Sequence, residues 1–138
     1  MNMKNSEANS SSVRKSEADQ PELRLSESEY RLMDIIWNEE PIGSTELSRL
    51  CLEKLGWKKS TSYTMLKRLA DKKAIQNHEA VVTSLIDKDQ VIRHESDALL
   101  EKSFRGSVPD FLAAFLQDRK LTREEAEKIA EMIRKAVD

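Results

Sequence analysis

Residues 57–73 read WKKSTSYTMLKRLADKK, and this stretch decides the fold. At about 100° per residue, the periodicity predicts one helix over 60–72 with two unlike faces. One face is predicted to pack inward: Ser62, Met65, Leu66 and Leu69. The opposite face and its flanks carry hydroxyls, one aromatic ring and cations: Ser60, Thr61, Tyr63, Thr64, Lys67 and Arg68. Such a face suits the major groove of DNA, where hydroxyls and cations meet phosphates and base edges.

Positive charge is concentrated around the same helix. Six cations stand against the single acid Asp71: Lys58, Lys59, Lys67, Arg68, Lys72 and Lys73. The whole chain has a net charge of only −2. Because neutralising phosphates releases counterions, a local basic cluster favours DNA binding even in a nearly neutral chain. On these residues alone, a lysine-rich face that is merely solvated stays an equal alternative.

A first helix is expected over 26–39. Ser26 followed three residues later by Glu29 is a capping box, and Leu25 is placed to act as a hydrophobic staple. Large apolar residues crowd the turns that follow. These features together predict that ordered structure begins at Leu25.

A second helix is expected over 45–55. Pro41 and Gly43 end the first helix, Ser44 is placed to cap the second, and Gly56 is placed to stop it. Three short helices with tight turns between them favour a helix-turn-helix arrangement. This position of the basic helix, third in order and ahead of a β pair, favours the DNA interpretation over a solvated face.

Two short strands are expected after the third helix, over 74–78 and 81–86. The second is rich in β-formers, and Glu79-Ala80 separates the two. No Asn-Gly or Asp-Gly pair marks the turn between them. We therefore predict a mainly α fold, a winged helix-turn-helix DNA-binding domain over 23–86 with a small β-hairpin wing.

A helical dimerisation region is predicted over 87–138, with helices over 87–103, 109–119 and from Thr122, which forms a capping box with Glu125. Its apolar stripes are too large for three short helices to bury among themselves, which indicates an interface. The predicted interface comprises Leu99, Phe104, Phe111, Leu112, Phe115, Leu116, Ile129 and Ile133. The alternative is the ordinary core of a monomer. A twofold-symmetric dimer would present its two recognition helices about 34 Å apart, one turn of DNA.

The N-terminal stretch 1–22 has almost no large apolar side chains, so we expect a disordered tail. It lacks the apolar run of a signal peptide, and no segment approaches the roughly 20 apolar residues of a membrane span. Cys51 is the only cysteine, which favours a reducing compartment and a cytoplasmic protein. Between Leu50 and Leu52, it is expected to be a buried apolar residue rather than a redox sensor.

Catalytic and cofactor chemistry is not expected. His78, His94 and Cys51 do not form a metal-ligand set of familiar spacing. Neither histidine has a neighbouring nucleophile, and the sequence holds no glycine-rich phosphate loop. A binding protein is therefore expected rather than an enzyme.

Two of these stretches resemble the penicillinase repressor family. LSESEY at 25–30, followed by MDIIW at 33–37, is similar to the opening of that family's first helix. Trp57, Ser60, Thr61, Thr64, Leu66, Arg68 and Leu69 match its recognition-helix pattern W-x-x-S-T-x-x-T-L-L-x-R-L. The resemblance extends from about Leu25 to the C-terminus.

The resemblance implies a dimeric bacterial repressor that blocks transcription from an inverted-repeat operator, usually of the TACA/TGTA type. The DNA-binding residues expected here are Lys58, Lys59, Ser60, Thr61, Tyr63, Thr64, Lys67 and Arg68. Position 63 is commonly basic in the family, so Tyr63 is a departure that bears on the operator sequence. The wing turn His78-Glu79-Ala80 also departs, because it is short and lacks Arg or Lys.

The resemblance further implies two modes of regulation. Members that respond to β-lactams are cut by a protease after a membrane receptor detects the antibiotic, at a position corresponding to Ala114-Phe115. Those members carry Asn-Phe there, so Ala114 is a departure. The copper-responsive branch carries C-terminal cysteines, whereas no cysteine follows Cys51 here. Metal sensing is therefore not expected.

A winged-helix protein-interaction module without DNA-binding activity is the competing hypothesis. It would be favoured if the surface around Lys67 and Arg68 were covered by another part of the chain.

Overall fold

The computed structural model describes residues 21–138 and divides into two compact units. The first unit extends to Glu95, and the second comprises Ser96–Asp138. The predicted tail over 1–22 therefore lies outside the described residues except for its last two. One long helix, α4 (Lys88–Phe104), runs across the boundary between the units.

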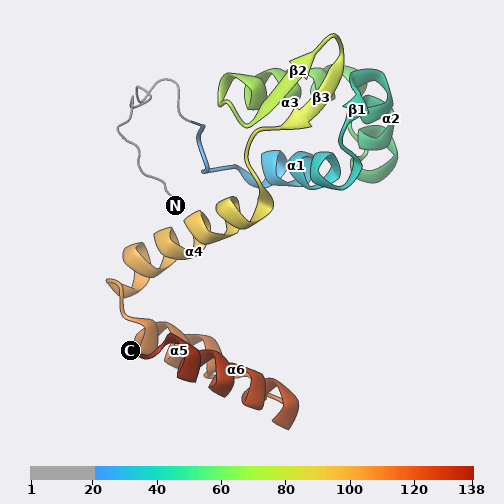
Figure 1. The fold of residues 1–138 in the computed structure, drawn as a ribbon. Coiled ribbons are helices and arrows are strands. Elements are labelled where there is room, and N and C mark those ends of the chain that lie inside the picture. The colour runs from blue at the N-terminus through green and yellow to red at the C-terminus, as the bar shows by residue number, and fades with distance from the viewer. Residues whose placement is uncertain (1–20) are drawn as a thin grey trace, which may run out of the picture. The chain divides into compact units, whose positions relative to one another are not determined.

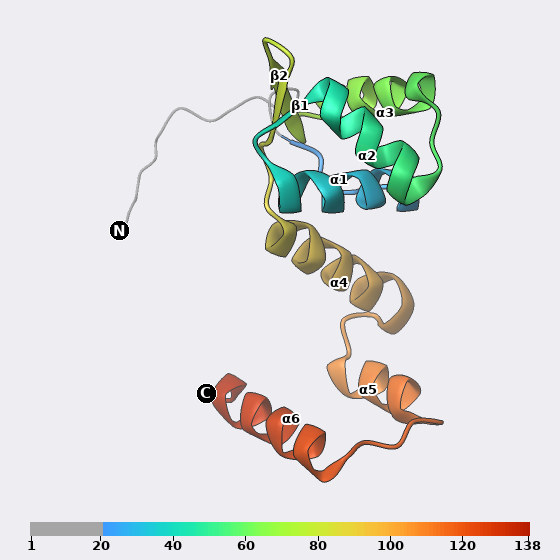
Figure 2. The same cartoon turned by 90° about the vertical axis from the view of Figure 1, so that its right-hand side faces the viewer.

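The first unit is a winged helix-turn-helix domain, as the sequence predicts (Figures 1 and 2). Figure 2 shows its small sheet at one side of the three helices. Its elements, ahead of α4, are α1 (Glu27–Glu39), β1 (Ile42–Gly43), α2 (Ser44–Leu55), α3 (Lys59–Asp71), β2 (Ile75–His78) and β3 (Val81–Ser84).

Local signals fix the ends of its helices. The predicted capping box is present at α1, where Ser26 accepts from the Glu29 N–H and the Glu29 carboxylate accepts from the Ser26 N–H. At the end of α2, Gly56 adopts a left-handed φ of 71°, as expected of a helix stop. The predicted cap at Ser44 is wrong. Gly43 is the N-cap of α2, and Ser44 is its first helical residue, with its N–H bonded to Ala80 O.

The wing contains one strand that the sequence did not predict. β3 pairs with β2 as an antiparallel hairpin, and on its other edge it pairs with the two-residue β1, in the order β1-β3-β2. Ile42 lies opposite Val82, and both are buried. The segment between α1 and α2 is thus tied to the wing, which lies about 40 residues further along the chain.

The core of the first unit is continuous and draws on every element of that unit. Its buried hydrophobic residues are Leu25, Leu32, Met33, Ile35, Ile36, Ile42, Leu47, Leu50, Cys51, Met65, Leu66, Leu69, Ala74, Ile75, Val82, Ile86 and Val91. The last of these shows that the start of α4 packs with this unit. Two further contacts hold that start, a 2.9 Å hydrogen bond from Trp37 Nε1 to Ile86 O and a 2.9 Å ion pair between Lys88 and Asp34.

The second unit is helical throughout. It holds the end of α4, then α5 (Val108–Leu116) and α6 (Arg123–Ala136). The predicted capping box of Thr122 and Glu125 is present at α6, and Ser107 caps α5. No residue of this unit is fully buried. No described helix is long and apolar enough to cross a membrane.

Candidate DNA-binding surface

Helix α3 presents one face to the core and the other to solvent. The inward face is the predicted one, because Ser62, Met65, Leu66 and Leu69 are all buried. This face packs against α2 and β2. The helix is therefore held rigidly, which is the condition for presenting the opposite face to a partner in a fixed orientation.

The outward face matches the predicted DNA-binding set with one exception. The exposed members are Lys58, Lys59, Ser60, Thr61, Thr64, Lys67 and Arg68. A shallow hollow runs along this face, lined by Ser60, Thr61, Thr64, Met65 and Arg68. Small hydroxyls next to a guanidinium leave room for base edges and phosphates to approach.

Tyr63 is the exception, because its side chain is half-buried and turned toward the start of α2. Hydrogen bonding with the side chains of Ser44 and Thr45 lowers the pKa of Tyr63. The Lys59 ammonium lies 5.9 Å from the centre of its ring. Tyr63 thus connects α3 to the N-terminal end of α2. Its position on the wheel did not reveal this contact, because the partners lie on another helix.

The cations around α3 differ in how far their charge is already compensated. Lys67 lies 3.5 Å from Asp71 in an exposed pair, which contributes little to stability. Lys72 pairs at 2.7 Å with Glu29. Within residues 21–138, no carboxylate pairs with the remaining cations of this cluster: Lys58, Lys59, Arg68 and Lys73.

The Glu29–Lys72 pair links the first turn of α1 to the C-terminal end of α3. Glu29 is buried, and its Oε1 accepts from both Lys72 Nζ and the Ser26 N–H. Burial raises the pKa of Glu29, but the hydrogen bonds from Lys72 and Ser26 outweigh it, so the pKa is lowered. Lys72 belongs by sequence to the basic cluster around α3, but Glu29 compensates its charge inside the domain.

The wing turn is short and carries no cation, as the sequence indicated. Glu79 and Ala80 form its two central residues with positive φ values of 50° and 63°. Both are exposed, as is His78. The imidazole of His78 lies 3.5 Å from the Glu79 carboxylate. This tip therefore offers little positive charge to a phosphate backbone.

Cys51 is fully buried beneath this surface, in agreement with its expected role as an apolar residue. Burial raises the pKa of the thiol, and the neighbouring Ser62 hydroxyl opposes that rise only in part. A buried thiol with a raised pKa holds little reactive thiolate.

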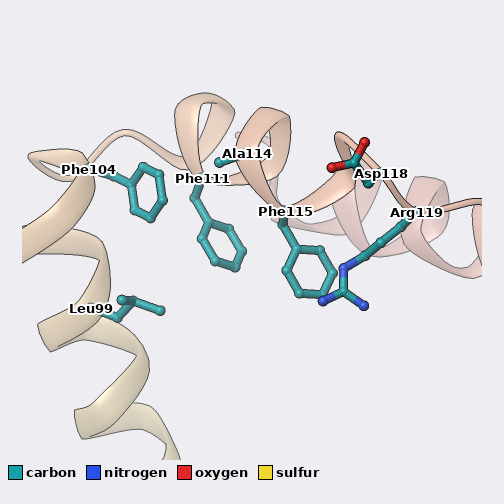
Figure 3. Close-up of a pocket in the computed structure, with 7 residues that line it drawn as sticks. All are labelled: Leu99, Phe104, Phe111, Ala114, Phe115, Asp118 and Arg119. Carbon is teal, nitrogen blue, oxygen red and sulfur yellow. The ribbon is translucent and has the colours of Figure 1, made fainter.

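A second surface lies in the second unit, over the predicted interface residues (Figure 3). All three phenylalanines of the chain meet there. The Phe104 and Phe111 rings are 5.5 Å apart, edge to face, and the Phe111 and Phe115 rings are stacked at 5.6 Å. The Arg119 guanidinium covers Phe115 at 4.3 Å. Figure 3 shows the three rings on the same side as Leu99, with the Asp118 carboxylate turned away.

The interface residues remain accessible to different degrees. Leu99, Phe115 and Ile133 are about half exposed, at 48%, 46% and 50%. The others are half-buried: Phe104, Phe111, Leu112, Leu116 and Ile129. The apolar rings line an open hollow rather than a filled core.

Comparison with known proteins decides the family. The family model described as the penicillinase repressor matches residues 25–135, most of the chain. The chain belongs to the penicillinase repressor family. A curated relative, the penicillinase repressor of Bacillus licheniformis, is 26% identical over 114 residues, which cover 80% of this chain and 89% of the relative.

Membership in the penicillinase repressor family makes the chain a DNA-binding transcriptional repressor. The family is a class of regulators and not a class of enzymes. Its match begins at Leu25, where the sequence resemblance also begins, and includes both units. The resemblance drawn from the first helix and from α3 is thereby confirmed.

Proposed function

We propose that the chain represses transcription as a homodimer, with each copy inserting α3 into the major groove at one half of an inverted-repeat operator. The exposed face of α3 carries this proposal. Its exposed hydroxyls and cations project from a helix whose other face is buried in the core. The contacts proposed are those of Lys58, Lys59, Ser60, Thr61, Thr64, Lys67 and Arg68, with Tyr63 supporting the start of α2.

Dimerisation is proposed to occur through the second unit. It exposes large apolar side chains, among them Met132 on α6 at 66% and Val137 just after α6 at 69%. Exposing this many large apolar side chains is costly in water and is typical of an interface. A second copy would cover the aromatic hollow. On an inverted repeat, the two α3 helices of a twofold-symmetric dimer would bind half-sites about 34 Å apart, one turn of DNA.

The proposal includes relief of repression by proteolysis in the second unit. Ala114 and Phe115 are exposed on α5, so a protease has access to the bond between them when the chain is a monomer. The bond lies within a helical segment, and cleavage there requires local unfolding of α5. Because a repressor acts where its operator lies, the proposed site of action is the cytoplasm of a bacterial cell.

The competing function, a protein-interaction module without DNA binding, has a weaker basis. It would be favoured if the chain covered the surface of α3, but Lys67 and Arg68 are exposed among the described residues. The family match also favours the repressor.

The double variant Lys67→Ala/Arg68→Ala tests the assignment of α3. We expect it to lose operator binding at physiological salt and to keep the dimer, measured by fluorescence anisotropy with a TACA/TGTA duplex and by sedimentation. Arg31→Ala/Arg49→Ala is the matched control, because both of these arginines are exposed but lie on α1 and α2, outside α3. Retained affinity in the Lys67/Arg68 variant would refute the assignment.

A further inference from the structure

The segment that precedes α1, residues 21–26, forms an arm that crosses the C-terminal end of α3. Two hydrogen bonds hold it there, from Glu22 N–H to Lys72 O at 2.9 Å and from Lys72 Nζ to Arg24 O at 3.1 Å. A polar hollow lies between the arm and α3. The charged groups that line it are Glu22, Arg24, Glu29, Arg68 and Lys72.

The charges in this hollow are unequally compensated. Lys72 and Glu29 neutralise each other across 2.7 Å. Within residues 21–138, Arg24 and Arg68 form no ion pair, and both side chains are exposed. Glu22 is the other carboxylate that lines the hollow, and its negative charge partly offsets the two arginines. The hollow therefore presents two uncommitted guanidinium groups against one exposed acid.

This hollow continues the DNA-facing side of α3. Arg68 lines it, and Arg68 also lines the shallow hollow along the outward face of α3 together with Thr61 and Thr64. A strand of DNA lying along α3 would reach the arm at the end of the helix. Guanidinium groups bind phosphate through two parallel hydrogen bonds, so arginine is the residue type suited to such a contact.

We propose that Arg24 binds a backbone phosphate of the DNA beside Arg68, so that the arm is part of the DNA-binding surface. The inference rests on the proposed function and extends it beyond α3. The contact is to phosphate and not to a base, so it contributes to affinity for every DNA sequence alike. Lys72 supports this contact indirectly in two ways. Its ammonium donates to Arg24 O and so holds the arm in place, and it neutralises the Glu29 carboxylate, which would otherwise repel a phosphate.

The test compares Arg24→Ala with the unchanged protein on a TACA/TGTA duplex and on a scrambled duplex. Each lost phosphate contact makes the slope of log K against log salt less negative by about 0.9. The factor by which affinity falls between about 50 and about 200 mM salt is then about 3.5-fold smaller per chain. We expect that reduction on both duplexes, together with roughly two- to fivefold weaker binding at physiological salt. Arg24→Lys retains the charge and is expected to restore the slope.

Two further variants sharpen the test. Arg31→Ala is the matched control, since Arg31 is an exposed arginine that pairs with Glu27 at 2.7 Å, and it is expected to leave the slope unchanged. Glu22→Gln removes the opposing charge and is expected to strengthen binding to both duplexes, roughly twofold. Because Arg24 holds Lys72 through its backbone oxygen, Arg24→Ala should unfold at the same temperature as the unchanged protein.

The outcomes separate the inference from the function on which it rests. If Lys67→Ala/Arg68→Ala loses binding while Arg24→Ala keeps the original slope and affinity, the arm is not a phosphate contact and the repressor function stands. If the unchanged protein binds neither duplex, the proposed function fails as well.

Discussion

The two units of the chain treat their apolar side chains in opposite ways. The first unit buries its large apolar residues in one core that extends from Leu25 to Val91. In the second unit, every residue from Ser96 onward is at least partly exposed, although three phenylalanines and many aliphatic residues are present. The pairs of elements that pack extensively all lie in the first unit.

This difference indicates that the first unit packs by itself, whereas the second needs a partner. The first unit buries its own apolar side chains, so it can hold α3, the proposed recognition helix, in place without packing from the rest of the chain. The second unit has helices with well-formed caps, but their apolar faces are uncovered. Most helical stability comes from packing an apolar face, so these helices require something to pack against. A second copy is the proposed answer.

The largest expected effect concerns the uncovered faces. Phe111→Ser/Phe115→Ser should weaken the dimer by at least about 4 kcal/mol, roughly 10³-fold in Kd, because buried aromatic anchors dominate interfaces. Sedimentation measures the loss, and the monomers should bind DNA weakly. Glu127→Gln, on the opposite face of α6 from Ile129, is the control that should leave the dimer intact. An unchanged sedimentation profile for the phenylalanine variant would contradict the proposal that the second unit is the dimer interface.

The next effect concerns the self-contained core. Leu66→Ala should lower the free energy of unfolding of the first unit by about 2–5 kcal/mol, through lost burial and the cavity left behind. Both tryptophans of the chain, Trp37 and Trp57, lie in this unit, so their fluorescence reports its unfolding. Leu52→Ala is the matched control, since Leu52 is 60% exposed and its loss should cost at most about 0.5 kcal/mol. A loss of stability that depends on protein concentration would show that this core needs a partner too.

The buried ion pair of the first unit predicts a pH dependence. The pKa of Glu29 is lowered by folding, so its contribution is present above the usual value of 4.5 and is lost as the pH falls from there through the lower folded pKa. Glu29→Gln should lower the free energy of unfolding by about 1–3 kcal/mol at neutral pH, a smaller loss than for a fully buried pair because Lys72 reaches solvent. It should also weaken the dependence of stability on pH in the acid range. Denaturant unfolding followed by tryptophan fluorescence at several pH values measures both. If Glu29→Gln loses stability at low pH as steeply as the unchanged protein does, other carboxylates cause that loss.

The smallest effect concerns the wing. Ala80 has a φ of 63°, a left-handed conformation that is strained for residues with a Cβ. Ala80→Gly should therefore stabilise the first unit by about 0.5–1 kcal/mol. The opposite sign is expected for Ala70→Gly within α3, which should cost about 1 kcal/mol. A destabilised Ala80→Gly variant would mean that the turn is not strained.

Features that depend on nearby residues were predictable from the sequence. The capping boxes at Ser26 and Thr122 and the stop at Gly56 each involve residues no more than a few positions apart, and each is present. The inward face of α3 follows from periodicity alone, and it is the face that is buried.

Features that depend on distant residues were missed or misplaced. β1 exists only because β3 provides a partner for Ile42, and Ser44 is drawn into α2 with its N–H bonded to Ala80 O. Lys72 resembles its basic neighbours in the sequence, yet it forms an ion pair with Glu29, which lies 43 residues earlier. The end of α5 at Leu116, short of the predicted 119, is a smaller error of boundary.

The most direct test of the central claim is the number of chains bound per duplex, measured in a salt titration with fluorescent TACA/TGTA and scrambled DNA. The account predicts two chains on the repeat, bound more tightly than on scrambled DNA, with affinity that falls steeply as salt rises. Equal and weak binding to both duplexes, or one chain on the repeat, would contradict the proposed dimeric repressor.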